Sequence, residues 1–366
     1  MSINKDQIPN PKSQIPNLKV QSPNPKAQIP KPKARSPNPK SQSPKPEAQS
    51  EVAVEVHDLE KKFGAFTAVN RINFQVKRGE IFGFLGPNGA GKSTTIRMLC
   101  GIISPTSGSG LVGGYDIVKE QRKIKQHIGY MSQKFSLYDD LTVEENINFY
   151  SGIYTIPEKE KDARRDEIIR TAGIEEFKTS LTRTLSGGWK QRLALGCAIM
   201  HRPSIIFLDE PTSGVDPITR NNFWSTIKAM AESGVTVFVT THYMDEAENC
   251  NRMALIYRGA IIAMGTPTEM KTKCMKNDVM EIQVPDSEVW ADKLRTVEGV
   301  KETALFGAGI HAVVDDAEQV GPRVRALFDG ARVTGYTVRK IMPSLEDVFV
   351  SLIETYDEHN SGVHKN

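Results

Sequence analysis

The run Glu80-Ile81-Phe82-Gly83-Phe84-Leu85 leads directly into Gly86-Pro87-Asn88-Gly89-Ala90-Gly91-Lys92-Ser93-Thr94. The first run has the composition of a buried strand, and the stretch Thr95–Cys100 after the second predicts a helix. The pattern G-x-x-x-x-G-K-[ST] between a strand and a helix is typical of a phosphate-binding loop. Its glycines let backbone N–H groups close around phosphate oxygens, and the helix N-terminus adds the positive end of its dipole. We therefore expect Gly86–Thr94 to bind a nucleotide, with Lys92 on the β- and γ-phosphates and the Ser93 hydroxyl on Mg²⁺.

A second run, Ser204-Ile205-Ile206-Phe207-Leu208-Asp209-Glu210, ends in two carboxylates. Four consecutive apolar residues suit a parallel strand that is buried on both faces. Ligands of such sheets lie beyond the carboxyl ends of the strands. Asp209 is thus placed to hold Mg²⁺, directly or through water, and Glu210 to orient or deprotonate an attacking water. A solvated acidic loop is the alternative, which the pairing with a phosphate-binding loop disfavours.

A third run, Leu185-Ser186-Gly187-Gly188-Trp189-Lys190-Gln191-Arg192, precedes an apolar helical stretch, Leu193–Met200. Serine followed by two glycines at a helix start offers a hydroxyl, backbone N–H groups and a helix dipole to a second phosphate. Two such devices in one chain suggest a nucleotide that is shared between two subunits. An ordinary capped helix is the alternative, for which a Gly-Gly pair in the first turn is a costly choice.

The chain has 366 residues, enough for two or three folded units. From Val52 to about Met275, short β-rich runs alternate with amphipathic stretches, which predicts an α/β fold. The remainder, 276–356, predicts the order β–α–β–β–α–β and a final helix over Ser344–Tyr356, with Ser344 and Asp347 in capping-box positions. We interpret it as a small ferredoxin-like α+β module with a structural or dimer-supporting role, and 357–366 as a flexible end.

The first 51 residues form a separate segment. Residues 9–50 are six copies of a seven-residue proline-rich unit, and eleven of the chain's 21 prolines lie there. Within residues 1–50, eight lysines and Arg35 against Asp6 and Glu47 give a charge of +7, so residues 51–366 carry −4 of the total +3. We expect a disordered, solvated extension. A basic tether for anionic lipid or nucleic acid is the less favoured alternative.

Composition excludes several classes of protein. No apolar run reaches the roughly 18–20 residues that cross a bilayer, so a membrane function would need another chain. The folded part is mildly acidic, which argues against a nucleic-acid partner. The four cysteines lack the spacing of a metal site or a disulfide scaffold, and the N-terminus lacks a secretory signal, which together favour a reduced cytosolic compartment.

Taken together, residues 52 to about 270 resemble the ATP-binding cassette (ABC) ATPases. The resemblance implies a P-loop fold with a RecA-like core, an antiparallel β-subdomain and a helical subdomain over 52–275. The run Leu185–Gly188 is similar to the family signature, whose Ser186, Gly187 and Gly188 would complete the ATP site of an opposing subunit. Trp189 departs from the Gln, Met or Glu of many relatives, which puts interface packing beside it in doubt.

The resemblance also implies roles for residues that lie in no recognisable motif by themselves. Gln133 resembles the Q-loop glutamine that senses Mg²⁺, and His242 the switch histidine that contacts the γ-phosphate. Asp216 lies in a stretch similar to the D-loop that crosses the dimer. Phe63 occupies the position of the aromatic that stacks on adenine.

Single-cassette chains without a long coiled-coil insertion resemble the transport ATPases; here Lys92 and Ser186 are only 94 residues apart. Among the transport ATPases, this sequence resembles those of bacterial multidrug exporters, which pair with type-2 ABC permeases. This resemblance implies an ATP- and Mg²⁺-dependent ATPase that dimerises with itself or a close paralogue. The chain would lie on the cytoplasmic face of the bacterial inner membrane, where 134–181 would dock the permease.

Two other functions stay open. The same cassette could drive a cell-envelope or lipid assembly complex, or a regulatory one, without drug export. A soluble ATPase that binds nucleic acid through the tail is the lesser alternative. Deletion of residues 1–50 would discard that last case if ATPase activity and localisation were unchanged.

Overall fold

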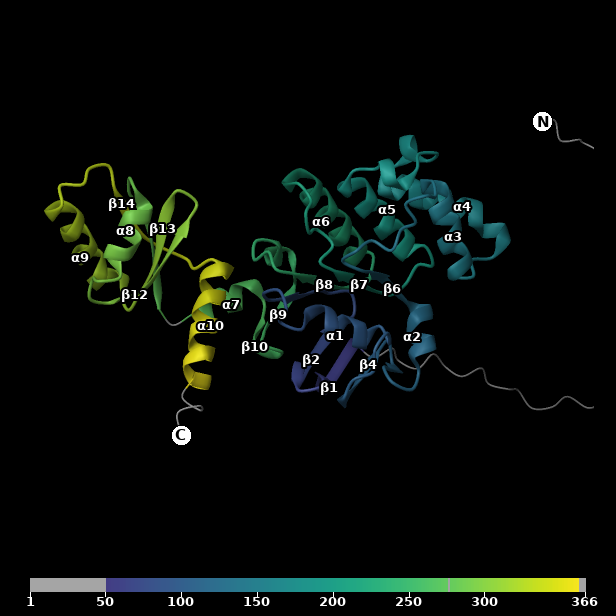
Figure 1. The fold of residues 1–366 in the computed structure, drawn as a ribbon, viewed down its shortest axis with the longest axis horizontal. Coiled ribbons are helices and arrows are strands. Elements are labelled where there is room, and N and C mark those ends of the chain that lie inside the picture. Colours follow the sequence, from purple (N-terminus) through teal and green to yellow (C-terminus); the bar gives the residue numbers. More distant parts are fainter. Residues whose placement is uncertain (1–50, 276, 362–366) are drawn as a thin grey trace, which may run out of the picture. The chain divides into compact units, whose positions relative to one another are not determined.

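The computed structural model describes residues 51–275 and 277–361, and the proline-rich segment predicted over 1–51 lies, apart from Glu51, outside them. Three sheets organise the described part (Figure 1). A four-stranded antiparallel sheet has the order β2-β1-β4-β5, and a six-stranded sheet has the order β10-β9-β3-β8-β7-β6. The strands of these two sheets are β1 (Val52–Phe63), β2 (Phe66–Lys77), β3 (Ile81–Leu85), β4 (Ser107–Val112), β5 (Tyr115–Asp116), β6 (Ile128–Met131), β7 (Ile205–Asp209), β8 (Thr236–Thr241), β9 (Arg252–Tyr257) and β10 (Ala260–Gly265).

Helices connect the strands of the six-stranded sheet, as expected for an α/β fold. Its strands run parallel except β10, which is antiparallel to β9. The helices α3, α4 and α5 fall between β6 and β7 in the chain and pack on one another. The helices of this region are α1 (Lys92–Leu99), α2 (Gln121–His127), α3 (Val143–Ile153), α4 (Glu158–Ala172), α5 (Gly187–Ile199), α6 (Pro217–Glu232) and α7 (Pro267–Lys273), with 3₁₀ turns at Glu175–Phe177, Thr182–Thr184 and Glu246–Asn249.

An aromatic core holds the two sheets of this region together. Every residue of β3, β7 and β8 is buried, which explains why their sequences are continuous apolar runs rather than alternating ones. The ring of Phe238 contacts four other phenylalanine rings at centroid distances of 5.4–6.0 Å; these are Phe74, Phe82, Phe84 and Phe207. This packing fixes the carboxyl ends of β3, β7 and β8 as one rigid edge.

The C-terminal module shows the predicted element order. Its sheet has the order β12-β13-β11-β14 and is antiparallel throughout. The elements are β11 (Asp278–Gln283), α8 (Ser287–Leu294), β12 (Val300–Phe306), β13 (Gly309–Val314), α9 (Ala317–Gly330), β14 (Thr337–Ile341) and α10 (Leu345–Ser361). One face of the sheet packs on α8 and α9 around Trp290 and Phe328. A second buried cluster joins the module to the preceding region, because Val279, Val313 and Val348 pack with Leu85 and Met253.

The last helix differs from the prediction at its end. The expected capping box is present, because the amide of Asp347 donates to Ser344 Oγ (3.1 Å) and the amide of Ser344 donates to Asp347 Oδ2 (2.7 Å). The helix, however, continues to Ser361 instead of ending at Tyr356, so 357–361 is not the flexible end that was expected. An ion pair between Arg258 and Asp357 (3.1 Å) adds a long-range contact to this extra turn.

The four cysteines differ in burial. Cys100, Cys197 and Cys250 are buried, and Cys274, just after α7, is half-buried. All four are free thiols. Burial raises the pKa of each thiol, with nearby Glu269 adding to the effect at Cys274. The described residues also contain no helix that is both long and apolar enough to cross a membrane.

His201, after α5, gives the fold a pH-dependent weak point. Its ring stacks on Tyr154 (centroids 3.9 Å apart) and its Nε2 lies 3.0 Å from Ile128 O, while Nδ1 is buried without a hydrogen-bond partner. Burial lowers the pKa of His201 to about 4, below its ordinary 6.5. The unfolded chain therefore binds a proton that the folded chain excludes, and stability falls as the pH drops from about 7 towards 4.

We expect the His201→Gln variant to lose less stability than the wild type between pH 7.5 and pH 5.5. The ring is not fully enclosed, so the difference should be at most about 1 kcal/mol, or about 2 °C in Tm. Thermal denaturation at both pH values measures it, with the exposed His57→Gln as the control. Equal pH dependence of wild type and His201→Gln would contradict the assignment.

Candidate nucleotide site

The phosphate-binding loop joins β3 to α1 with a backbone that only glycine tolerates at two points. Gly91 is the N-cap of α1 and has φ 111°, a left-handed conformation that disfavours side chains. A Cβ atom on Gly86 would lie 2.2 Å from Ile256 O, so the loop presses against β9. The helix begins at Lys92, not at Thr95 as predicted. The backbone N–H groups of the first turn are thereby directed toward a ligand in the loop.

Lys92 lies at the centre of a buried charged cluster. Its side chain is 3% exposed and its Nζ lies 3.0 Å from Glu210 Oε1, whose side chain is 7% exposed. The same ammonium donates to Gly86 O at 2.8 Å and Pro87 O at 3.2 Å. The strand ends of β3 and β7 thus bring together a cation and a carboxylate from distant parts of the sequence.

Asp209 and Ser93 form the oxygen-rich side of the cluster. Ser93 Oγ donates to Asp209 Oδ1 at 2.9 Å, and Thr240 Oγ1 at the end of β8 donates to the same oxygen at 2.9 Å. Burial raises the pKa of Asp209, and these two hydrogen bonds oppose the rise. The hydroxyl of Thr240 also accepts from the backbone amide of Glu210 (2.9 Å), so one side chain contacts the Asp209 carboxylate and the backbone of Glu210.

These groups fit Mg²⁺. The ion prefers oxygen ligands and binds through one or two carboxylates together with phosphates and water. Ser93 and Asp209 supply such oxygens side by side, and the amide oxygen of Gln133 is a third candidate. Within residues 51–275 and 277–361, no group of three or more His, Cys, Asp and Glu side chains could hold a metal alone. An ion here would therefore be shared with the phosphates.

Gln133 and His242 both reach Glu210, although they follow different strands. Gln133, after β6, donates from Nε2 to Glu210 Oε2 at 3.1 Å. His242, after β8, has Nδ1 3.4 Å from the same oxygen. Glu210 itself has φ 49°, a conformation that is rare for a residue with a side chain and that turns its carboxylate into the cluster. The structure thus brings five of the predicted side chains together: Lys92, Ser93, Gln133, Asp209 and Glu210, with His242 at the edge.

A cavity of about 410 Å³ lies over the phosphate-binding loop. Its walls include Asn88, Gly89 and Gly91–Thr94 from the loop, together with Gln133 and Glu210. The predicted Phe63 lines it, and so does Phe66, which sequence reasoning missed; their exposed fractions are 52% and 62%. Two exposed aromatic rings beside a phosphate-binding loop provide an apolar surface for a planar base. The two rings flank the turn of the β1–β2 hairpin, because Phe63 ends β1 and Phe66 begins β2. The Phe-x-x-Phe spacing in the sequence could have pointed to the second ring.

The signature run lies outside this cavity. Ser186 is the exposed N-cap of α5 and its side chain caps no backbone N–H, so the hydroxyl is available to another molecule. None of Ser186, Gly187 and Gly188 lines the cavity. Gly187 has open space around it, but a Cβ on Gly188 would lie 2.8 Å from Thr219 Cγ2 of α6. Helix packing within the subunit therefore also favours glycine at position 188.

Trp189 has its own explanation in the fold. Its ring packs on Phe177 (centroids 4.8 Å apart), and the Arg192 guanidinium lies 4.9 Å from its centroid. The side chain is half-buried and belongs to the hydrophobic cluster of α3, α4 and α5. The tryptophan at position 189 therefore packs inside the helical region.

Asp216 is the N-cap of α6 and accepts a hydrogen bond from the amide of Thr219 at 3.0 Å. It lies beyond the end of β7, after a turn that contains Thr212 and Gly214. Asp216 does not line the nucleotide cavity. Within this chain, Asp216 therefore acts as the cap of α6.

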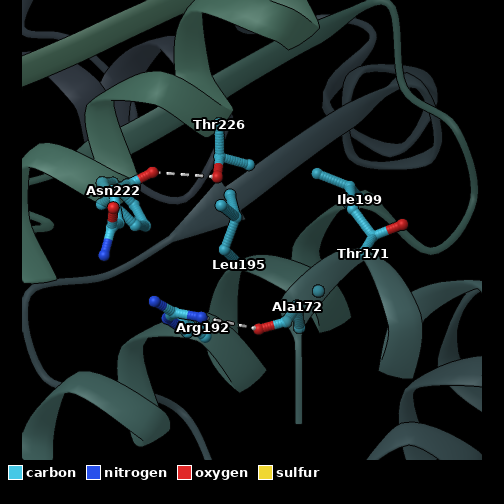
Figure 2. A pocket seen from close by; sticks show the side chains of 9 residues that line it. Thr171, Ala172, Arg192, Leu195, Ile199, Asn222 and Thr226 are labelled. Carbon is cyan, nitrogen blue, oxygen red and sulfur yellow. Dashed lines mark hydrogen bonds between the residues drawn. The ribbon is translucent and has the colours of Figure 1, made fainter. Parts of the chain in front are cut away.

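A second cavity, of about 360 Å³, lies between α4, α5 and α6 (Figure 2). Its polar groups are already engaged locally, because Arg192 donates to Ala172 O (3.4 Å) and Thr226 Oγ1 donates to Asn222 O (3.1 Å). None of the predicted site residues lines it. We interpret it as a gap in packing between α6 and the helical region, and not as the nucleotide site.

Comparison with known proteins agrees with this geometry. Residues 69–213 match the family model described as ABC transporter. A probable multidrug ABC transporter ATP-binding protein of Escherichia coli, YbhF, is 53% identical over 228 residues, which is 62% of this chain and 39% of that protein. The linearmycin resistance ATP-binding protein LnrL of Bacillus subtilis is 35% identical over 303 residues, 82% of this chain and 97% of LnrL. The daunorubicin/doxorubicin resistance ATP-binding protein DrrA of Streptomyces peucetius is 34% identical, with 82% and 92% covered.

Solved structures give the same class. CbiO1 of Clostridium perfringens, part of an ABC transporter complex, has a TM-score of 0.57 at 30% identity and covers 61% of this chain and 92% of its own. The dimeric ATP-binding cassette MJ0796, solved with ADP and Pi, has a TM-score of 0.54 at 27% identity, with 58% and 98% covered. The fold and the site thus define an ABC-type P-loop ATPase, as predicted. The chain belongs to the ATP-binding subunits of ABC transporters.

Proposed function

We propose that this chain hydrolyses ATP in a head-to-tail dimer and thereby powers export of small molecules through a separate membrane permease. The observation that carries the proposal is the convergence of Lys92, Asp209 and Glu210 under a cavity whose other wall is aromatic. The names of relatives in multidrug, linearmycin and daunorubicin resistance support export as the use of that chemistry.

Each residue of the cluster has a defined task in this proposal. Lys92 and the N–H groups at the start of α1 hold the phosphates, and Phe63 with Phe66 packs against the base. Ser93 and Asp209, with Gln133, would hold Mg²⁺, which when bound offsets the negative charge of the phosphates. Glu210 takes a proton from the attacking water, and His242 steadies the γ-phosphate.

The exposed Ser186 supports the dimer. Its hydroxyl and the N–H groups of α5 would form a phosphate-binding end that is not part of the chain's own cavity. A second copy, or a close paralogue, placed head to tail would bring that end to the γ-phosphate. ATP then binds the closed dimer better than the open one, and hydrolysis removes this preference.

An aromatic and aliphatic surface on the helical region supports the permease as partner. Tyr138, Phe149 and Ile153 are exposed by 40–55%, and the rings of the first two are in edge contact at 4.6 Å. Exposed apolar side chains that lie in a group often mark an interaction site, whereas single ones are common on any protein surface. In this proposal a cytoplasmic segment of the permease covers them, which places the chain on the cytoplasmic face of the inner membrane.

We expect the tagged chain to purify from native membranes in mild detergent together with a polytopic membrane protein in nearly equal amount. The triple variant Tyr138→Ser, Phe149→Ser, Ile153→Ser should lose that protein while keeping its Tm. The control Leu305→Ser, which removes an equally exposed side chain of β12, should retain it. A chain that is purified without any membrane protein would favour the regulatory alternative, and a co-purified envelope-assembly complex would favour that one.

A further inference from the structure

A buried carboxylate close to His242 has no task in the mechanism above. Glu246 lies in the 3₁₀ turn after β8, and its side chain is 1% exposed. Within the described part of the chain, neither of its oxygens makes a hydrogen bond. A carboxylate taken out of water needs a compensating cation. Arg220 of α6 supplies it, with Nε 3.4 Å from Glu246 Oε1.

Arg220 contacts the segment after His242 at two further points. Its Nη1 lies 3.6 Å from Asp245 Oδ2, and its Cζ lies 4.2 Å from the centroid of the Tyr243 ring. That ring in turn lies 4.1 Å from the imidazole of His242. A planar guanidinium can stack on an aromatic ring and pair with carboxylates at the same time, which lysine cannot do. One side chain therefore holds residues 243, 245 and 246.

The other end of Arg220 is fixed to the start of α6. Its backbone amide donates to Asp216 O at 3.0 Å, and the side chain of Asp216 caps the same turn. A movement of Asp216 would thus be transmitted through this turn to the Arg220 side chain. The contacts form a continuous path from Asp216 through Arg220 and Tyr243 to His242.

We propose that Arg220 is a positioning residue that ties the start of α6 to the segment 243–246 and so fixes the imidazole of His242 beside Glu210. The inference rests on the proposed function, in which His242 acts at the γ-phosphate. It adds that the orientation of His242 depends on where Asp216 and α6 lie. Arg220 does not line the nucleotide cavity, so it would act through His242.

Steady-state ATP hydrolysis by the full chain tests the proposal. Arg220→Ala should lower kcat on the order of 10- to 100-fold, because small displacements of a catalytic group cost rates of that size. KM for ATP should change less than about threefold, because the contacts of Lys92 and the loop remain. Arg220→Lys, which keeps the charge but loses the flat stacking group, should be intermediate. The control Arg323→Ala removes an arginine of α9 that pairs with Glu298, and its kcat and KM should match those of the wild type.

A purely structural role would give a different pattern. Arg220→Ala leaves Glu246 charged and unpaired, so its Tm should fall. Adding Glu246→Gln removes the buried charge and should restore Tm, but kcat should stay low because Tyr243 is still unsupported. Recovery of kcat together with Tm in the double variant would overturn the proposal.

A double-mutant cycle separates this inference from the proposed function. If Arg220 acts through His242, adding Arg220→Ala to His242→Ala should lower kcat by less than twofold further. Additive losses would overturn the positioning role while leaving the ATPase assignment intact. Wild-type turnover in His242→Ala and Glu210→Gln would instead refute the catalytic assignments on which the inference rests.

Discussion

The Glu210→Gln variant should bind ATP but hydrolyse it at least about 10²–10³-fold more slowly than the wild type. Glutamine keeps the size of the side chain and can still contact Gln133 and His242, but it cannot accept a proton from water. Because only hydrolysis is removed, the variant should accumulate as an ATP-bound dimer. Colorimetric phosphate release and size-exclusion chromatography with Mg²⁺ and ATP measure the two effects.

The matched control is Glu232→Gln, the same substitution on the exposed carboxylate at the end of α6. It should retain wild-type turnover and elution. Wild-type turnover in Glu210→Gln would remove Glu210 from the chemistry. Loss of ATP binding in that variant would mean that the carboxylate supports the loop instead.

The Lys92→Ala variant should lose ATP affinity by on the order of 100-fold. Charge-assisted hydrogen bonds to phosphate are worth about 1.5–3 kcal/mol, and about 2.8 kcal/mol corresponds to that factor. A second effect follows from the 3.0 Å pair with Glu210: without Lys92 the buried carboxylate is unpaired, which costs about 3 kcal/mol of folding stability. Equilibrium binding of a fluorescent ATP analogue and thermal denaturation report the two separately.

The double variant Lys92→Ala, Glu210→Gln distinguishes these effects. Neutralising the carboxylate should restore Tm to near the wild-type value, while ATP affinity stays low. If affinity recovered along with Tm, the loss in Lys92→Ala would be a folding defect and the phosphate contact would be wrong.

The sequence predicted the site where spacing along the chain decides the geometry. The loop Gly86–Thr94 and the carboxylates Asp209 and Glu210 follow strands whose buried composition is plain, and parallel strands end at one edge of a sheet. The convergence of Lys92 with Glu210 could therefore be expected. The element order of the C-terminal module was likewise readable from alternating patterns and from the Ser344–Asp347 capping pair.

Contacts between distant elements could not be read in the same way. Thr240 bonds the Asp209 carboxylate and the Glu210 backbone, but a threonine in a buried strand looks like any β-branched residue. Gly188 was predicted as half of a phosphate-binding pair, and the close approach of Thr219 on another helix is a second reason for glycine at this position. Register and helix packing decide these roles, and neither is encoded in local spacing.

Because the four cysteines differ in burial, the natural protein can be labelled with a probe at a single cysteine. A thiol reacts through its thiolate and only where reagent can reach it. Cys274 is therefore the preferred target of a maleimide probe, and Cys100, Cys197 and Cys250 are shielded by the core. One label per subunit, at a residue that does not line the nucleotide cavity, would give a single intersubunit distance in a homodimer. The proposed ATP-driven closure could then be followed by energy transfer or spin–spin coupling without replacing any native residue.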